Sequence, residues 1–151
     1  MAHFKTDTTM KQIATILTLL LISLNGLCDT IDYWHVYIND SLVAKFDENS
    51  KDLTFKIKAQ SIKENDKITI RYFKDTHCID CVYGLFVRDQ QKRKLRETLT
   101  TEHFGKLTLT LKDLTDFGKL NNSKEYHFHF FERNNKGEHA PFRLILIMTL
   151  N

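Results

Sequence analysis

Apolar and polar residues alternate at every second position in several short stretches of the chain, and this alternation constrains the fold most strongly. In residues 53–58, LTFKIK, and in residues 105–111, GKLTLTL, apolar side chains are separated by threonine or lysine. Successive side chains of a β-strand point to opposite faces of the sheet, so a period of two predicts a strand with one buried face. A chain built from such stretches is expected to pack sheets against each other.

Further strands are predicted where alternation, β-branched residues and aromatic residues recur between turn signals. These segments are 33–39, 42–46, 67–73, 82–89, 125–133 and 141–150, with a less regular hairpin arm within 90–99. Asn39-Asp40-Ser41 and Asn134-Asn135-Lys136-Gly137 have the composition of hairpin turns. The sequence therefore predicts an all-β fold, an antiparallel two-sheet sandwich of about eight or nine strands, immunoglobulin-like or jelly-roll-like.

One segment has a helical rather than a strand period. Leu114, Phe117 and Leu120 are three residues apart, and Gly118 interrupts them. Glycine lowers helix stability, so the segment is interpreted as one short helical turn near residues 112–118.

The N-terminal region has the organisation of a secretory signal peptide. Lys5 and Lys11 precede an uncharged run from Ile13 to Leu24, which is shorter than the roughly 20 apolar residues that span a bilayer. Cleavage after Cys28 would leave residues 29–151 as a single domain, secreted or held in the periplasm or cell envelope, with no stable membrane span. Lipidation of Cys28 is the alternative processing, and the leader could start at Met1 or at Met10.

Charge argues against a nucleic-acid ligand. The chain carries 22 Lys and Arg and 19 Asp and Glu residues, a formal net charge of +3. A nucleic-acid-binding domain normally concentrates a much stronger basic field, so no nucleic-acid partner is predicted.

Cys78 and Cys81 form a Cys-x-x-Cys motif between two predicted strands, and three interpretations are open. A redox dithiol usually has its first cysteine at a helix N-terminus, whereas the residues that follow here, VYGLFV, favour a strand. A zinc site needs further ligands, of which His77 is the nearest in sequence. An even pair of cysteines in an exported chain favours a disulfide that closes the turn, and we expect Cys78 and Cys81 to be bonded to each other.

His127 and His129 lie on one face of the predicted strand 125–133, about 7 Å apart by strand geometry. That spacing suits two ligands of one metal ion, which would need a third from the remaining histidines or the cysteine loop. The alternative is that both histidines line the solvent side, while Tyr126, Phe128 and Phe130 fill the core.

Tyr33, His35 and Tyr37 share the side of the first strand opposite to Trp34, Val36 and Ile38. Exposed aromatic side chains stack on sugar rings or anchor protein partners, because they bring large contact area at little entropic cost. If the three are exposed together, they form a candidate binding face.

The sequence contains no Ser-His-Asp order, phosphate-binding glycine loop or paired-carboxylate motif, so no catalytic residue and no cofactor are predicted. The first hypothesis is an exported, non-enzymatic β-sandwich that binds a protein or carbohydrate partner at the cell envelope or outside the cell. The alternatives are a secreted or periplasmic metal-binding protein that uses His127 and His129 with other histidines or the Cys78 and Cys81 loop, and a thiol-disulfide oxidoreductase.

Overall fold

The computed structural model describes residues 16, 31–74, 78, 80–134, 136–137 and 140–151. The predicted signal peptide, residues 1–28, lies outside the described residues apart from Ile16. Residues 31–151 form one structural unit. Its elements are β1 (Tyr33–Ile38), β2 (Ser41–Asp47), β3 (Thr54–Ile57), the short 3-10 helix η1 (Ala59–Ser61), β4 (Lys67–Phe73), β5 (Val82–Asp89), β6 (Lys94–Thr100), β7 (Lys106–Thr110), α2 (Leu111–Asn121), β8 (Glu125–Arg133) and β9 (Arg143–Leu150).

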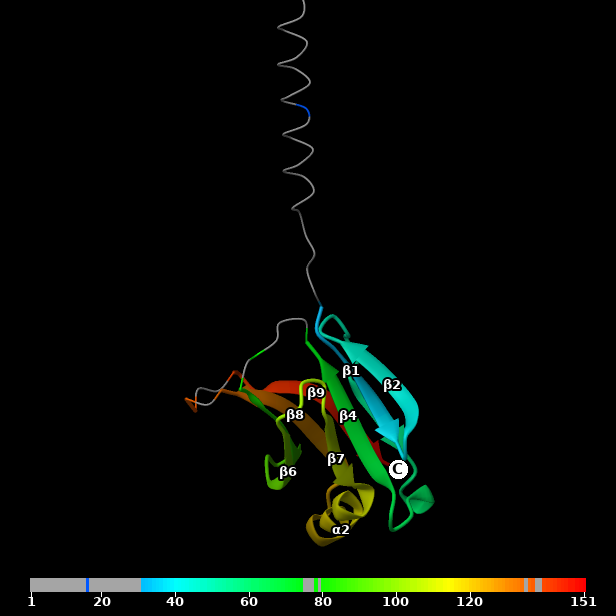
Figure 1. The fold of residues 1–151 in the computed structure, drawn as a ribbon. Helices are drawn as coiled ribbons and strands as arrows, with labels where there is room; N and C mark the ends of the chain where they lie inside the picture. The colour runs from blue at the N-terminus through cyan, green and yellow to red at the C-terminus, as the bar shows by residue number, and fades with distance from the viewer. Residues whose placement is uncertain (1–15, 17–30, 75–77, 79, 135, 138–139) are drawn as a thin grey trace, which may run out of the picture. The chain divides into compact units, whose positions relative to one another are not determined.

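The strands form two sheets, as the alternation predicts (Figure 1). The four-stranded sheet has the order β2-β1-β4-β7, and the five-stranded sheet has the order β3-β9-β8-β5-β6. Asn39 and Asp40 form the predicted turn between β1 and β2, with φ angles of 46° and 67°. Asparagine and aspartate tolerate this left-handed region, which the tightest hairpin turns require.

Both sheets contribute to one hydrophobic core. The inward positions of β8, Tyr126, Phe128 and Phe130, are buried as predicted. Trp34 of β1 is 1% exposed, and its indole N–H donates a hydrogen bond of 2.6 Å to the carbonyl oxygen of Ile145 in β9. This bond joins the two sheets directly, because β1 and β9 belong to different sheets.

The prediction of a wholly antiparallel arrangement is wrong at one edge. β3 pairs parallel to β9, with Thr54 opposite Ile147 and Ile57 opposite Leu150. Alternation of side chains fixes which face of a strand is buried, but it is the same for both strand directions. The direction of β3 depends on its tertiary partner, which the local sequence does not specify.

The predicted helical turn near 112–118 is also too short, because α2 extends over 11 residues. Leu111, Leu114 and Gly118 form its buried face. Gly118 does not break the helix: it lies where the hydroxyl of Tyr126 and the carbonyl of Ser123 approach the backbone closely. The helix ends at Asn121, and the left-handed φ of 51° at Asn122 lets the N–H of Ser123 donate to the Gly118 carbonyl at 3.0 Å.

Replacing Gly118 with alanine is expected to destabilise the fold, although the same change usually stabilises a helix by up to about 1 kcal/mol. A methyl group at this position would overlap Tyr126 Oη and the Ser123 carbonyl. We expect a loss of about 1–3 kcal/mol in the free energy of unfolding, measured by urea denaturation. Leu120→Ala is the matched control, because Leu120 is 86% exposed and its loss should change little. A gain in stability for Gly118→Ala would contradict the close approach.

The helix and the cysteine loop lie at opposite ends of β4. Lys67, at the start of β4, is paired with Thr110, which directly precedes α2. Cys78 and Cys81 follow Phe73, at the other end of the strand. Among the described residues, no helix has the length and apolar character needed to cross a bilayer.

Candidate functional site

The segment between β4 and β5 holds Cys78 and Cys81, which are joined by a disulfide with their Cα atoms 5.6 Å apart. Cys81 is 4% exposed and belongs to the hydrophobic core, whereas Cys78 is only partly buried against it. β5 begins at Val82, so a strand follows the motif, as expected. His77, named above as a metal ligand from this loop, lies outside the described residues.

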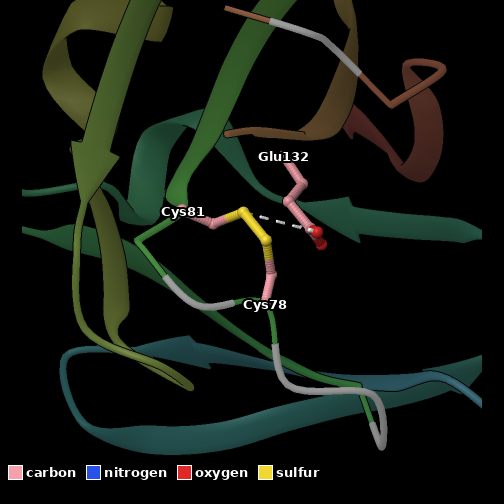
Figure 2. A group of neighbouring side chains, drawn as sticks. All are labelled: Cys78, Cys81 and Glu132. Atoms are coloured by element: carbon pink, nitrogen blue, oxygen red, sulfur yellow. Dashed lines mark hydrogen bonds between the residues drawn. A yellow bond between two sulfur atoms is a disulfide. The ribbon is translucent and has the colours of Figure 1, made fainter. Parts of the chain in front are cut away.

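Glu132 of β8 lies beside the disulfide (Figure 2). Its Oε1 atom is 3.7 Å from Cys81 Sγ, and its Oε2 atom is 3.1 Å from Lys74 Nζ. The Glu132 side chain is 13% exposed and that of Lys74 is 32% exposed. Cys78, Cys81 and Glu132 are the one group of three potential metal ligands that converges among the described residues.

Tyr83 and His103 lie next to the disulfide, on the side where a cavity opens. The Tyr83 hydroxyl is 3.1 Å from His103 Nδ1 and donates a longer bond of 3.5 Å to the Cys78 carbonyl. An open cavity of about 360 Å³ lies next to both cysteines, and Tyr83, Thr101 and His103 line it. Burial is the main cause that raises the pKa of Tyr83, and the charge of Glu132 adds to it. The tyrosine therefore stays protonated and available as a donor at neutral pH.

The predicted binding face is on the outer side of the four-stranded sheet. Tyr33 is 44% exposed, and His35 and Tyr37 are partly exposed beside it. Tyr33 is paired across the strands with Phe73 of β4, and their rings stack at 4.7 Å between centroids. The sheet thus brings the three predicted residues together with an aromatic residue that sequence reasoning did not select.

Phe104, between β6 and β7, extends this surface. Its ring lies 5.3 Å from that of Phe73, and it is 36% exposed. Its backbone has a left-handed φ of 60°, which costs a bulky residue about 1–2 kcal/mol. Arg71 Nε donates to the Phe104 carbonyl at 3.4 Å. We call Tyr33, His35, Tyr37, Phe73 and Phe104 the aromatic row.

Two cations border the aromatic row. Lys45 of β2 and Arg71 of β4 lie opposite His35 on its two sides in the sheet. The guanidinium of Arg71 also lies over the ring of Phe73, 5.4 Å from its centroid. Burial first, and then the charges of Lys45 and Arg71, lower the pKa of His35. His35 is therefore neutral at pH 7, and the positive charge of this face comes from lysine and arginine.

His127 and His129 lie on the outer side of β8, and each contacts a different residue. His127 Nε2 is 2.7 Å from Glu125 Oε1, which forms an ion pair when the histidine is protonated. His129 stacks on Phe86 at 4.9 Å. Burial is the main cause that lowers the pKa of His129, followed by the charges of Arg88 and His127. Within the described residues, neither histidine belongs to a group of three convergent ligands.

Sequence reasoning missed Glu132, Lys74 and Phe73. Glu132 is separated from Cys81 by 51 residues, and only the pairing of β5 with β8 brings them together. Phe73 could have been found, since the strand 67–73 was predicted and its last residue faces outward with Arg71. Its partner Tyr33 required the register between β1 and β4.

Comparisons with known proteins give no functional lead. No protein-family model matches the chain, and neither a curated protein nor a solved structure is significantly similar to it.

Proposed function

We propose that this chain is an exported binding module, an immunoglobulin-like sandwich whose aromatic row binds a protein partner with an acidic surface. The observation that carries the proposal is the stacked pair of Tyr33 and Phe73 on an outer sheet face, with Lys45 and Arg71 beside it. The apolar run from Ile13 to Leu24 supports export, and an exported chain would be secreted or periplasmic.

Strand order supports the immunoglobulin-like class over the jelly roll. In immunoglobulin-like domains, strands A, B and E are neighbours in one sheet, and strands C, F and G in the other. Here β1, β4 and β7 are neighbours in one sheet, and β5, β8 and β9 in the other. The start of β8 also holds Tyr126, whose hydroxyl donates to the carbonyls of Leu114 and Ser123 at 2.6 and 3.2 Å. A tyrosine bonded in this way at the same corner is a hallmark of that class.

The orientation of the rings favours a protein over a sugar as the ligand. The planes of Tyr33 and Phe73 are 13° apart, so the two rings cover each other and stand on the sheet. A sugar ring needs an aromatic face that is open to it, whereas a protein side chain can pack against ring edges and hydroxyl groups. Tyrosine and arginine are also enriched among the residues that dominate protein interfaces.

The charges of this face indicate an acidic partner. Lys45 is exposed and Arg71 is partly exposed. No ion pair of Arg71 or Lys45 occurs within the described residues. Carboxylates of a partner would meet these cations next to the aromatic row and add orientation to the apolar contact.

Removal of Tyr33 and Arg71 is expected to weaken binding. Proteins captured from secreted and envelope fractions by the wild-type chain would be purified and titrated by calorimetry. A hot-spot residue contributes about 2 kcal/mol, so Tyr33→Ala or Arg71→Ala should each raise the Kd roughly 30-fold. Lys136→Ala, an exposed cation in the connection after β8, is the control and should bind as the wild type does.

Two results would contradict the proposal. A purified partner that binds both variants as tightly as the wild type would place binding on another surface. Binding on a glycan array that disappears in Tyr33→Ala would make the ligand a carbohydrate, the other class that an exposed aromatic face serves.

Metal binding through His127 and His129 remains a prediction from sequence. Calorimetric titration with zinc tests it, and a His127→Ala variant that binds zinc as well as the wild type would assign any observed binding elsewhere.

A further inference from the structure

The two cysteines of the disulfide differ in exposure. Cys81 is 4% exposed and Cys78 is partly exposed, and the open cavity beside them is lined by Tyr83, Thr101 and His103. Because Cys78 is the more exposed of the two cysteines, we expect a thiolate that enters from this cavity to reach its sulfur first. Exchange requires an in-line approach of one sulfur to another, so the accessible sulfur is the one that reacts with an external substrate.

A carboxylate stands on the buried side of the pair. Glu132 Oε1 is 3.7 Å from Cys81 Sγ, at a distance from which it can accept the S–H of a reduced cysteine (Figure 2). Lys74 Nζ, 3.1 Å from Oε2, keeps the carboxylate in place. Glu132 thus contacts both Cys81 and Lys74, the last residue that the structure describes before Cys78.

We propose that Cys78 and Cys81 form a thiol-disulfide exchange site, in which Cys78 forms the mixed disulfide and Glu132 accepts the proton of Cys81. The substrate class is a disulfide, RSSR, of a small molecule or a protein. This activity is independent of binding at the aromatic row.

The exchange proceeds in two balanced steps. The thiol of Cys78 releases its proton to water, and its thiolate attacks RSSR, forming the mixed disulfide Cys78–S–S–R and releasing RS⁻, which takes a proton from water. Cys81 then attacks the Cys78 sulfur, while its S–H proton passes to Glu132. The bond between Cys78 and Cys81 forms, the second RS⁻ leaves, and it takes up a proton as Glu132 releases the one that it accepted. In sum, the protein dithiol is oxidised, and one RSSR is reduced to two RSH.

A strand rather than a helix follows the Cys-x-x-Cys motif, and a carboxylate offers a different way to activate a cysteine. A helix N-terminus stabilises a thiolate through its dipole. A carboxylate acts differently, because it removes the proton at the moment of attack and needs no helix. Its contribution therefore falls on the second step, the resolution of the mixed disulfide.

The first experiment compares the two cysteines separately. Cys81→Ser and Cys78→Ser variants are mixed with oxidised glutathione, and the mixed disulfide is followed by mass spectrometry. Cys78 in the first variant should react at least tenfold faster than Cys81 in the second, and the difference should vanish in urea. Equal rates in the folded variants, or a faster Cys81, would overturn the proposal.

The second experiment isolates Glu132. Reduced wild type, Glu132→Gln and Glu64→Gln, an exposed control, are mixed with oxidised glutathione and quenched with acid at intervals. Glu132→Gln should accumulate roughly tenfold more mixed disulfide than the other two, with an unchanged rate of its formation. A Glu132→Gln variant that resolves the mixed disulfide as fast as the wild type would overturn the role of Glu132. The cysteine comparison still tests the site if this variant fails to fold.

Discussion

Replacing Trp34 with alanine is expected to lower the free energy of unfolding by about 4 kcal/mol, a large part of the 5–15 kcal/mol typical of a domain. The indole is 1% exposed, stacks on Tyr72 at 5.7 Å and donates its N–H to the Ile145 carbonyl of the other sheet. The substitution leaves a cavity between the sheets and an unsatisfied carbonyl. Urea denaturation followed by circular dichroism measures the change.

Two further variants separate these effects. Trp34→Phe keeps an aromatic ring and removes the hydrogen bond, so its loss should fall well below that of Trp34→Ala. Leu42→Ala changes an exposed side chain of the neighbouring strand and should cost less than about 0.5 kcal/mol. A Trp34→Ala variant as stable as Leu42→Ala would contradict the role of Trp34 as the link between the sheets.

Replacing Arg93 with methionine is expected to cost about 2–3 kcal/mol at neutral pH. The Asp89 side chain is fully buried, and Arg93 forms an ion pair with it at 2.5 Å. Removing one partner of a buried pair typically costs about 3–5 kcal/mol, and we expect less here because the Arg93 side chain is 42% exposed. Arg96→Met is the control: Arg96 pairs with Asp113, but both side chains are exposed, so its loss should stay below about 1 kcal/mol.

The cost of Arg93→Met should depend on pH. Burial is the largest influence on the pKa of Asp89 and raises it, but hydrogen bonds and charge from Arg93 outweigh burial and leave the pKa lowered. Because the pKa is lowered, the pair contributes its full stabilisation at pH values above the unfolded-state pKa of about 3.9. This stabilisation is lost as the pH falls through the lower pKa of the folded state. The two proteins should therefore differ fully at pH 7 and converge below about pH 4. A difference that stays constant with pH would contradict the charge-based explanation.

The strands could be predicted because most of them carry their own alternation or are rich in β-branched and aromatic residues. Tyr126, Phe128 and Phe130 read as an inward face from the sequence alone, and they are buried in the core. The parallel partner of β3 could not be predicted, because alternation carries no information on direction. The role of Gly118 could not be predicted either, because its contact with Tyr126 depends on how the helix packs.

For the candidate sites, the sequence predicted only the residues that lie together on a single strand or in a single loop. Tyr33, His35 and Tyr37 share one face of β1, as their alternation along one strand predicts. Phe73 and Glu132 join their sites through strand pairing, and a single sequence contains no signal for that register. The burial of Asp89 follows the inward alternation of β5, but the local rule for a charged residue predicts exposure. The ion pair with Arg93, which lies after the turn that follows β5, compensates the burial of Asp89.

The parallel pairing of β3 with β9 also determines when this unit can fold. β9 lies between β3 and β8, and it places Thr54 beside Ile147. Contacts so distant along the chain give a high contact order, which slows two-state folding toward the range of milliseconds to seconds. The five-stranded sheet therefore cannot be completed before β9 is in place, and until then β3 has no partner strand and β8 has an unpaired edge that can associate with other chains.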